Sequence, residues 1–438
     1  MRWTEEQVLA AAPDAAAVKA ARGLTSPGRW DEAGAAGAAA LWGSCRGSGR
    51  EPYRAAVDLA GPAYRCTCPS RKVPCKHVLA LLLRWATGDV TDRPVPGWVG
   101  EWLSTRADRA EVAQARAAAR EARQSAGESS PARAAASGKR AERRAERVAT
   151  GVTELERWLA DQVRHGLANT APDEWAAVAA RMVDAQAPGL ARLVRRAAEL
   201  RLGEDFSDRL VAELARLRLL LAAYHRLDAL PEPLAGTVRV RVGFPVDRAE
   251  LLAGPTVRDR WWVLGGRDEA EDALSVRRVW LAGADTGRVA LLLSYAAAGQ
   301  AHDVAYPAGT RLEADLAYFP GAVPLRALVG AEHAPPAAVA GEPPAEPLGA
   351  VLDGYARALA ADPWLEEWPV VLAGAVPAAG GDHAVLVDGQ EVPVRAGGAA
   401  WWRLVAVSGG RPVTLAGEWD GGALRPLTAW AGGRAVPL

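Results

Sequence analysis

The spacing of apolar residues changes along the chain and separates helical regions from β-rich regions. Between residues 151 and 230 apolar positions recur every three to four residues, as in "VTELERWLADQVRHGL", and this spacing predicts four helices. Because the connections between them are short, we expect an antiparallel bundle. From 237 to 333 the period changes to two, in segments such as "TVRVRVGF", "RWWVLGG" and "SVRRVWLAG", which predicts a β-rich domain.

A third region follows a passage rich in Pro, Ala and Glu that runs from Ala334 to Pro347. Residues 348–438 begin with the helical pattern "LGAVLDGYARALAAD" and continue with strand-like segments, among them "HAVLVDGQEVPV", "WWRLVAVSGG" and "RPVTLAGEWDGG". The last segment has the pattern of a hairpin with an acidic mouth, in which Glu418 and Asp420 are interpreted as turn formers rather than catalysts. The two β-rich regions are compatible with one continuous domain or with two small barrels.

Residues 1–103 mix both patterns. "TEEQVLAAA" and "PDAAAVKAARGL" predict two short helices, whereas "ALWGSC" and "EPYRAAVDL" predict two strands joined by a Gly-rich turn. Residues 104–150 are rich in Ala, Arg and Glu and predict a linker, helical in parts and disordered around Gly127–Gly138. A nucleic-acid-binding arm is the alternative to this solvated tether.

The sequence "CTCPSRKVPCKH" gathers three of the four cysteines and one of the six histidines. Cys66 and Cys68 are separated by one residue, as are Cys75 and His77, and in an extended segment such residues point to the same side. Three thiolates and one imidazole complete a tetrahedral zinc site, and because no position stays open for water, the zinc is expected to be structural. The alternatives are a redox dithiol pair or reduced core cysteines.

The neighbours of this cluster support the metal interpretation. Four cations, Arg65, Arg71, Lys72 and Lys76, are expected to lower the thiol pKa values and ease the deprotonation that binding requires. After His77 a helix is predicted up to Gly88, and Trp42, Tyr53 and Val57 are expected to pack against it. Cys45, the remaining cysteine, is interpreted as a buried apolar residue, with a fifth-ligand or redox role as the alternative.

The CxC, loop, CxH arrangement resembles the SWIM-type zinc finger. Together with "LWGSCRGSG" and the C-terminal "GEWDGG", it is similar to a bacterial SWIM family whose members are encoded beside MoxR-type AAA ATPases and von Willebrand factor A proteins. Together with the periodicity, this predicts an α+β multidomain protein: a small zinc-stabilised ββα-like SWIM module (core 41–88), a central helical bundle and a C-terminal, mostly antiparallel β region. The resemblance also implies an accessory role with such a protein partner.

Composition narrows the remaining classes of function. Lys and Arg total 52, Asp and Glu also total 52, and half of the residues are apolar, which argues against a disordered or an overall basic chain. No apolar run approaches the roughly 20 residues that cross a bilayer, and the N-terminus lacks a secretory signal. We therefore expect a soluble, cytoplasmic protein without a membrane partner, in which a metal site is favoured over disulfides.

Two non-enzymatic functions remain. Phosphate-loop, dinucleotide, GxSxG and HExxH motifs are missing from the sequence, so no catalytic residue and no cofactor besides zinc is assigned. The remaining histidines are read as ordinary core or surface residues: His165, His225, His302, His333 and His383. A protein-interaction role is preferred. Nucleic-acid binding is the alternative, because residues 41–88 hold eight basic and two acidic residues, whereas residues 339–438 hold eleven acids and six arginines.

Overall fold

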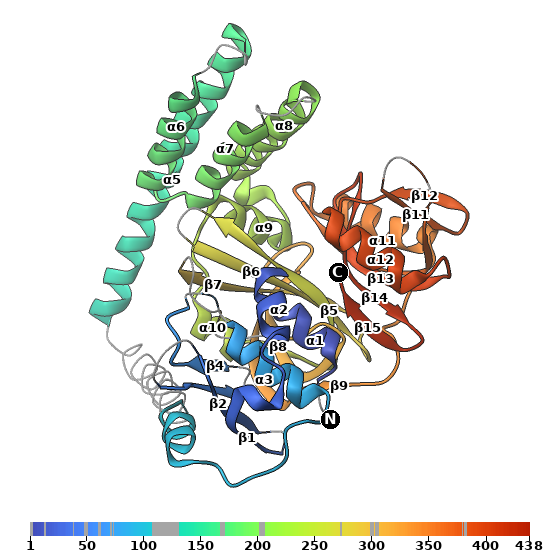
Figure 1. Cartoon of the computed structure of the whole chain (residues 1–438). Coiled ribbons are helices and arrows are strands. Elements are labelled where there is room, and N and C mark those ends of the chain that lie inside the picture. Colours follow the sequence, from blue (N-terminus) through green and yellow to red (C-terminus); the bar gives the residue numbers. More distant parts are fainter. Residues whose placement is uncertain are drawn as a thin grey trace.

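The computed structural model describes residues 3–12, 15–37, 39–47, 51–59, 63–70, 72, 74–106, 131–166, 171–200, 206–271, 274–297, 302, 306–378, 380 and 383–438. These residues form an α+β protein with an N-terminal module that carries the Cys/His cluster, a helical bundle, a β-barrel and a C-terminal sheet. The bundle extends away from the barrel, and the C-terminal sheet lies at the barrel's side (Figure 1).

The N-terminal module is a four-stranded antiparallel sheet covered by helices. Its elements are α1 (Glu5–Ala10), α2 (Ala15–Arg22), the short 3-10 helix η1 (Pro27–Arg29), β1 (Trp30–Ala36), β2 (Ala40–Cys45), β3 (Tyr53–Asp58), β4 (Ala63–Cys66) and α3 (Lys76–Ala86). The predicted helices and the strands "ALWGSC" and "EPYRAAVDL" are confirmed. Val57 packs in the same core as α3, as predicted.

Trp42 is the exception in this module, because it packs on the opposite face of the sheet from α3. It contacts Val99 on a helix that covers residues 97–106, while its neighbour Leu41 faces α3. Successive residues of a strand point to opposite faces, so Leu41 and Trp42 cannot both reach α3. The prediction that Trp42 packs against α3 is therefore wrong.

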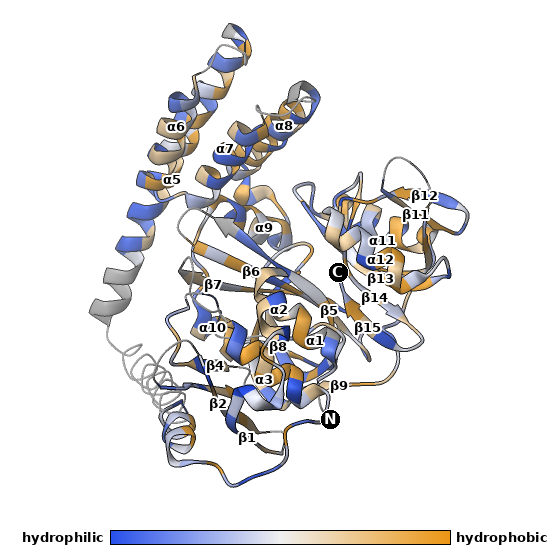
Figure 2. Cartoon of the chain, in the orientation of Figure 1, coloured by the Kyte–Doolittle hydropathy of each residue, from blue (hydrophilic) through white to orange (hydrophobic). Residues whose placement is uncertain are grey.

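The bundle consists of α5 (Pro131–His165), α6 (Pro172–Asp184), α7 (Pro188–Leu200), α8 (Phe206–Tyr224) and α9 (Glu232–Val242), with the 3-10 turn η3 (Leu227–Ala229) before α9. Its core holds Val152, Trp175, Leu190 and Leu221. In Figure 2 the stretch of α5 that follows its grey first turns is hydrophilic, and apolar residues become frequent where the helix meets α6. Helix α5 already includes Gly138, so the predicted disorder is wrong for residues 131–138; residues 107–130 lie outside the described ranges.

Helix α9 replaces a predicted strand. "TVRVRV" alternates apolar and charged residues, but Ala235, Val238 and Val242 also share one helical face, and all three are buried. Contact with the bundle overrides the β preference of valine. The helix ends at Gly243, whose φ of 113° is a left-handed conformation that favours glycine.

A closed five-stranded barrel follows helix α10 (Arg248–Ala253). Its strands are β5 (Val257–Glu271), β6 (Leu274–Gly283), β7 (Val289–Ala297), β8 (Thr310–Tyr318) and β9 (Arg326–Ala338). They close in the order β5-β6-β7-β9-β8, with β7 and β9 parallel and the other pairs antiparallel. This is the Greek-key strand order of OB-fold barrels. Strand β9 also takes in the first residues of the passage that was expected only to separate two regions.

The C-terminal region forms a separate six-stranded antiparallel sheet, so the two β-rich regions are a barrel and a sheet. Its elements are α11 (Leu348–Ala361), β10 (Trp368–Pro377), β11 (Ala384–Val387), β12 (Gln390–Pro393), α12 (Gly398–Ser408), β13 (Val413–Trp419), β14 (Leu424–Ala431) and β15 (Arg434–Pro437). "WWRLVAVSGG" was predicted as a strand but forms α12. Trp401, Leu404 and Ser408 lie on its buried face, and a left-handed Gly409 ends it.

The barrel and the C-terminal sheet share an apolar core. Trp262 and Trp280 on the outer face of the barrel pack with Leu427 and Trp430 of the sheet. Glu418 of β13 is buried and accepts hydrogen bonds from the Trp280 indole (2.8 Å) and the Arg267 guanidinium (2.8 Å). The interpretation of Glu418 as a turn former is therefore wrong, whereas Asp420 does form a turn by accepting from the backbone N–H groups of residues 422 and 423.

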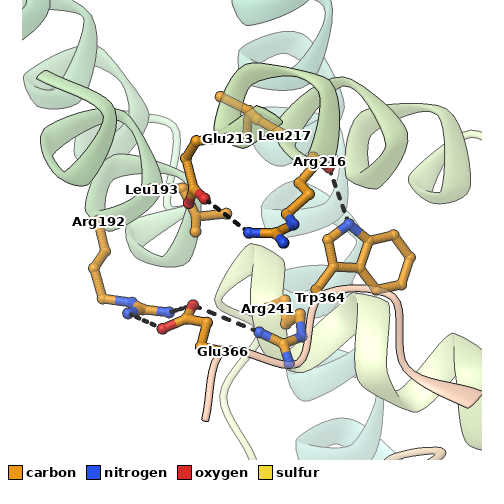
Figure 3. A pocket seen from close by; sticks show the side chains of 8 residues that line it. All are labelled: Arg192, Leu193, Glu213, Arg216, Leu217, Arg241, Trp364 and Glu366. Atoms are coloured by element: carbon orange, nitrogen blue, oxygen red, sulfur yellow. Dashed lines mark hydrogen bonds and ion pairs between the residues drawn. The ribbon is translucent and has the colours of Figure 1, made fainter. Parts of the chain in front are cut away.

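A short segment joins the C-terminal region to the bundle. The Trp364 indole enters the bundle and donates to the backbone carbonyl of Arg216 (3.0 Å), and Glu366 pairs with Arg192 (3.0 Å) (Figure 3). The cavity between these groups measures about 20 Å³, room for about one water molecule. Over the described ranges, none of the helices combines the length and the apolar character that a bilayer crossing requires.

Candidate metal centre

Strand β4 and the turn after it position the first two sulfur atoms. Cys66 ends β4 and pairs with Ala55 of β3. The strand pairing continues one step further, because the backbone N–H of Thr67 donates to the Arg54 carbonyl (3.1 Å). The strand pairing therefore reaches Thr67, and the chain then bends at Cys68, whose sulfur atom lies in the same cluster as that of Cys66.

The first turn of α3 positions the other two donors. Cys75 is the N-cap residue of this helix, and His77 lies in its first turn; both are buried. The apolar residues that follow, including Val78, Leu79 and Leu82, pack into the core of the module and fix the helix against β3. The sequence "CKH" thus places a thiol and an imidazole at the N-terminus of α3, and the packed helix fixes their positions.

The four donors converge on one point. One ligand atom from each of Cys66, Cys68, Cys75 and His77 lies within 4.8 Å of every other, and the Cys66 Sγ–His77 Nδ1 distance is 3.8 Å. A tetrahedral zinc ion with Zn–S bonds of about 2.3 Å and Zn–N bonds of about 2.0 Å needs donors roughly 3.5–3.8 Å apart. The residues therefore fit one zinc ion, and the predicted zinc site is confirmed in its composition and its convergence.

The sulfur atoms share protons in a way that suits metal binding. The Cys66 thiol donates to Cys75, which lowers the pKa of Cys75 to about 4 and raises the pKa of Cys66. Burial raises the pKa of Cys68. The largest effect on the pKa of Cys75 comes from a neighbouring thiol. That the flanking cations also lower these thiol pKa values stays a prediction. A divalent cation that binds here displaces the shared protons and stabilises the thiolates in their place.

Tyr53 supports the histidine ligand from the far side. Its ring lies 4.8 Å from the His77 ring, centroid to centroid, at an interplanar angle of 35°. Packing of this kind restricts the rotation of a ligating imidazole and keeps Nδ1 directed at the metal. The sequence predicted that Tyr53 packs against the helix after His77, but it gave no signal that the contact is with the ligand itself.

Cys45 and the other histidines stand apart from this centre in the part of the chain that the structure describes. Cys45 is fully buried in the apolar core of the module, which confirms its interpretation as a core residue. His225 contacts Glu156 (3.0 Å), His333 contacts Asp315 (3.0 Å), and His302 lies between two serines. His383 stacks on a tryptophan, and the side chain of His165 lies outside the described residues.

Several of the eight basic residues within 41–88 contact other groups of the protein. Arg84 is buried and lies over the Trp30 ring, Arg46 forms an ion pair with Asp31, and Arg54 lies over Trp98. Arg50 and Arg71 lie outside the described residues. Burial therefore withdraws Arg84 from an external ligand, and Asp31 offsets the charge of the exposed Arg46.

Comparison with known families agrees with both the finger and the bundle. Residues 56–86 match the SWIM zinc finger. Residues 143–242 match the SWIM-associated four-helix bundle domain, and this range includes α9, in agreement with its helical structure. No curated protein and no solved structure matches the chain significantly. The chain thus carries a SWIM zinc finger, positioned to bind one zinc ion, together with the helical domain that accompanies it.

Proposed function

We propose that this protein is a non-enzymatic, zinc-stabilised interaction protein that serves as an accessory subunit of a larger assembly. The observation that carries the proposal is the closed donor set, in which four protein ligands fill a tetrahedral site at the junction of β4 and α3. Such a centre holds a fold together and leaves no position for a reacting water. The metal then acts as a cross-link between strand and helix.

The arrangement of the barrel favours protein interaction over nucleic-acid binding. In OB-fold barrels the outer face near the second and third strands is the usual oligonucleotide surface. Here Trp262 and Trp280 on the outer barrel face are buried under β13 and β14 of the same chain, and Arg267 is paired with Glu418. The aromatic and basic groups that would bind a strand of nucleic acid are thus occupied by the acidic C-terminal region.

Nucleic-acid binding by the finger is the second candidate. Lys72 and Lys76 are exposed beside the zinc ligands, and Arg29 lies near them on the wall of the same cavity. These cations are the observation that favours it. A basic group of this size suits weak, salt-sensitive contacts with phosphates rather than sequence recognition.

The resemblance noted from the sequence suggests the partner: a MoxR-type AAA ATPase or a von Willebrand factor A protein encoded nearby. The direct test is titration calorimetry of the purified, zinc-loaded chain against each candidate from the same organism. We expect a dissociation constant in the micromolar range or tighter for at least one of them. Heat changes at the dilution level for both candidates would overturn this partner assignment.

A further inference from the structure

An open cavity of about 680 Å³ is lined by residues of helix α2 and by Pro69, Ser70 and Lys72, which come between the two ligand pairs in the sequence. This volume falls in the usual range of binding pockets. The zinc ligands Cys68 and His77 line one part of the cavity, and residues of α2 line another part. Two metal ligands therefore help to form the cavity, although the space inside the cavity is separate from the metal position.

The rim of this cavity is basic. Arg29, Arg46, Lys72 and Lys76 line it, and all four are exposed. The backbone N–H of Arg46 donates to the Arg29 carbonyl (2.7 Å), which holds these two residues side by side. Arg29 and Lys76 both act to lower the pKa of the buried Cys45 against the larger effect of burial, so their charges converge on the same region. Asp31 forms an ion pair with Arg46 and offsets its positive charge.

Another part of the cavity wall is apolar. Ala16, Ala17, Ala20 and Leu24 come from α2 and the turn after it, and they present small side chains toward the cavity. Tyr53 lies at the mouth beside Gly47, where a Cβ atom would come within 2.2 Å of the Tyr53 ring. A residue with a side chain at position 47 would collide with the Tyr53 ring and change the shape of the cavity there.

The combination of a basic rim and an apolar wall selects the occupant. Inorganic phosphate would use the cations but leave the apolar wall in contact with water. Single-stranded nucleic acid stacks successive bases on several aromatic side chains. One face of Tyr53 packs against His77, and the described residues that line the cavity include no other Tyr, Trp or Phe. A short peptide that alternates acidic and apolar side chains satisfies both walls, and a cavity of this volume accommodates a few residues.

We infer that this cavity binds an acidic, partly apolar peptide segment of a protein partner. The inference rests on the proposed interaction function and specifies the chemistry of the partner. The carboxylates lie at the Arg29 and Lys76 side, and the apolar side chains lie on Ala20 and Leu24. Zinc binding and peptide binding are coupled, because loss of the metal releases Cys68 and with it Pro69 and Ser70, which line the cavity.

The test uses the full, zinc-loaded chain and a fluorescein-labelled hexapeptide of alternating glutamate and leucine, followed by fluorescence anisotropy. We expect saturable binding that weakens as salt is raised, since the rim charges are exposed. The double variant Arg29→Gln/Lys76→Gln should bind about tenfold more weakly. Ala20→Trp, at an exposed position away from the metal ligands, should block the cavity to a similar extent.

The controls separate this site from general charge effects. Lys139→Gln/Arg140→Gln removes two exposed charges from α5, far along the chain, and should leave binding unchanged. Metal analysis should find one zinc in every variant. The inference is overturned if a glutamine–leucine hexapeptide binds equally well, if Ala20→Trp binds like the unmodified chain, or if inorganic phosphate or oligothymidine displaces the probe as well as unlabelled peptide does.

The outcome for this site and the outcome for the proposed function can be told apart. If Arg29→Gln/Lys76→Gln and Ala20→Trp bind the protein partner as tightly as the unmodified chain does, the cavity assignment fails and the interaction function stands. If the unmodified chain binds the peptide but neither candidate partner, the cavity assignment stands and the partner assignment fails.

Discussion

Glu366 and Glu367 are adjacent in the chain, yet their carboxylates pair with arginines of two different domains. Glu366 contacts Arg192 of the bundle (3.0 Å), as Figure 3 shows, whereas Glu367 contacts Arg267 of the barrel (2.8 Å). Trp364, two residues before Glu366, belongs to the apolar core of the bundle. This segment therefore fixes the C-terminal region against both the bundle and the barrel.

The first prediction concerns the stability that Glu366 provides. Arg192, Arg196 and Arg241 surround this carboxylate and lower its pKa to about 2, against the opposing effect of burial. A carboxyl group whose pKa is lowered by folding stabilises the folded state above its unfolded pKa of about 4.5 and loses that effect as the pH falls toward 2. Glu366→Gln should lower the free energy of unfolding by about 3 kcal/mol at pH 7.

Denaturant unfolding at several pH values checks this prediction. The difference between the unmodified chain and Glu366→Gln should shrink as the pH falls from about 4.5 toward 2. Glu154→Gln is the matched control, because Glu154 forms a half-exposed ion pair with Arg181, and it should change stability by no more than about 0.5 kcal/mol. A difference that is independent of pH would contradict the role assigned to the Glu366 charge.

The second prediction concerns Glu418, which is 2% exposed and accepts from both Trp280 and Arg267. Glu418→Gln leaves Arg267 without one of its buried charge partners, so we expect a loss of about 3 kcal/mol in the stability of the junction between barrel and sheet. Glu269→Gln is the control, because Glu269 pairs with the same arginine from a half-exposed position. Equal losses of stability in the two variants would show that the buried position of Glu418 does not strengthen its contribution to the free energy of unfolding.

These two carboxylates also show where sequence reasoning ends. The zinc ligands could be predicted because all four donors lie within one short stretch, so their spacing alone specifies the site. Glu418 could not, because its partner Trp280 is 138 residues away and only the fold brings them together. "TVRVRV" fits both a strand and a helix face, and contact with the bundle decides between them. The cavity beside the finger depends on α2, whose lining residues are alanines and so give no sequence signal of a binding site.

The third prediction concerns the metal. Cys75→Ala removes the donor whose thiolate is most stabilised, so the chain should lose its single zinc ion. The strand β4 and the helix α3 should then exchange their amide hydrogens faster, because in zinc modules the binding free energy is folding free energy. The bundle has its own core and should stay protected. Metal analysis and hydrogen exchange measure both effects, and equal deprotection of finger and bundle would contradict this independence.

The fourth prediction concerns Cys45, which belongs to the core and not to the donor cluster. Cys45→Ala should retain one zinc per chain and lower stability by about 1 kcal/mol, the cost of a small cavity in a packed core. Metal analysis beside Cys75→Ala makes the comparison direct, since both variants remove one buried sulfur. A fall in zinc content would make Cys45 a ligand.

The last prediction concerns nucleic acid. Arg84 is buried and Arg46 is paired, while the barrel face with Trp262 and Trp280 is covered, so the full chain should bind DNA only through exposed cations such as Lys72. We expect dissociation constants of roughly 10⁻⁴–10⁻⁶ M at physiological salt, with a log–log salt slope of about 0.9 for each phosphate contact. Lys72→Ala should reduce that slope by about one contact while zinc stays bound. Nanomolar, sequence-dependent binding at physiological salt, measured by anisotropy with labelled duplexes, would replace the interaction function with the nucleic-acid one.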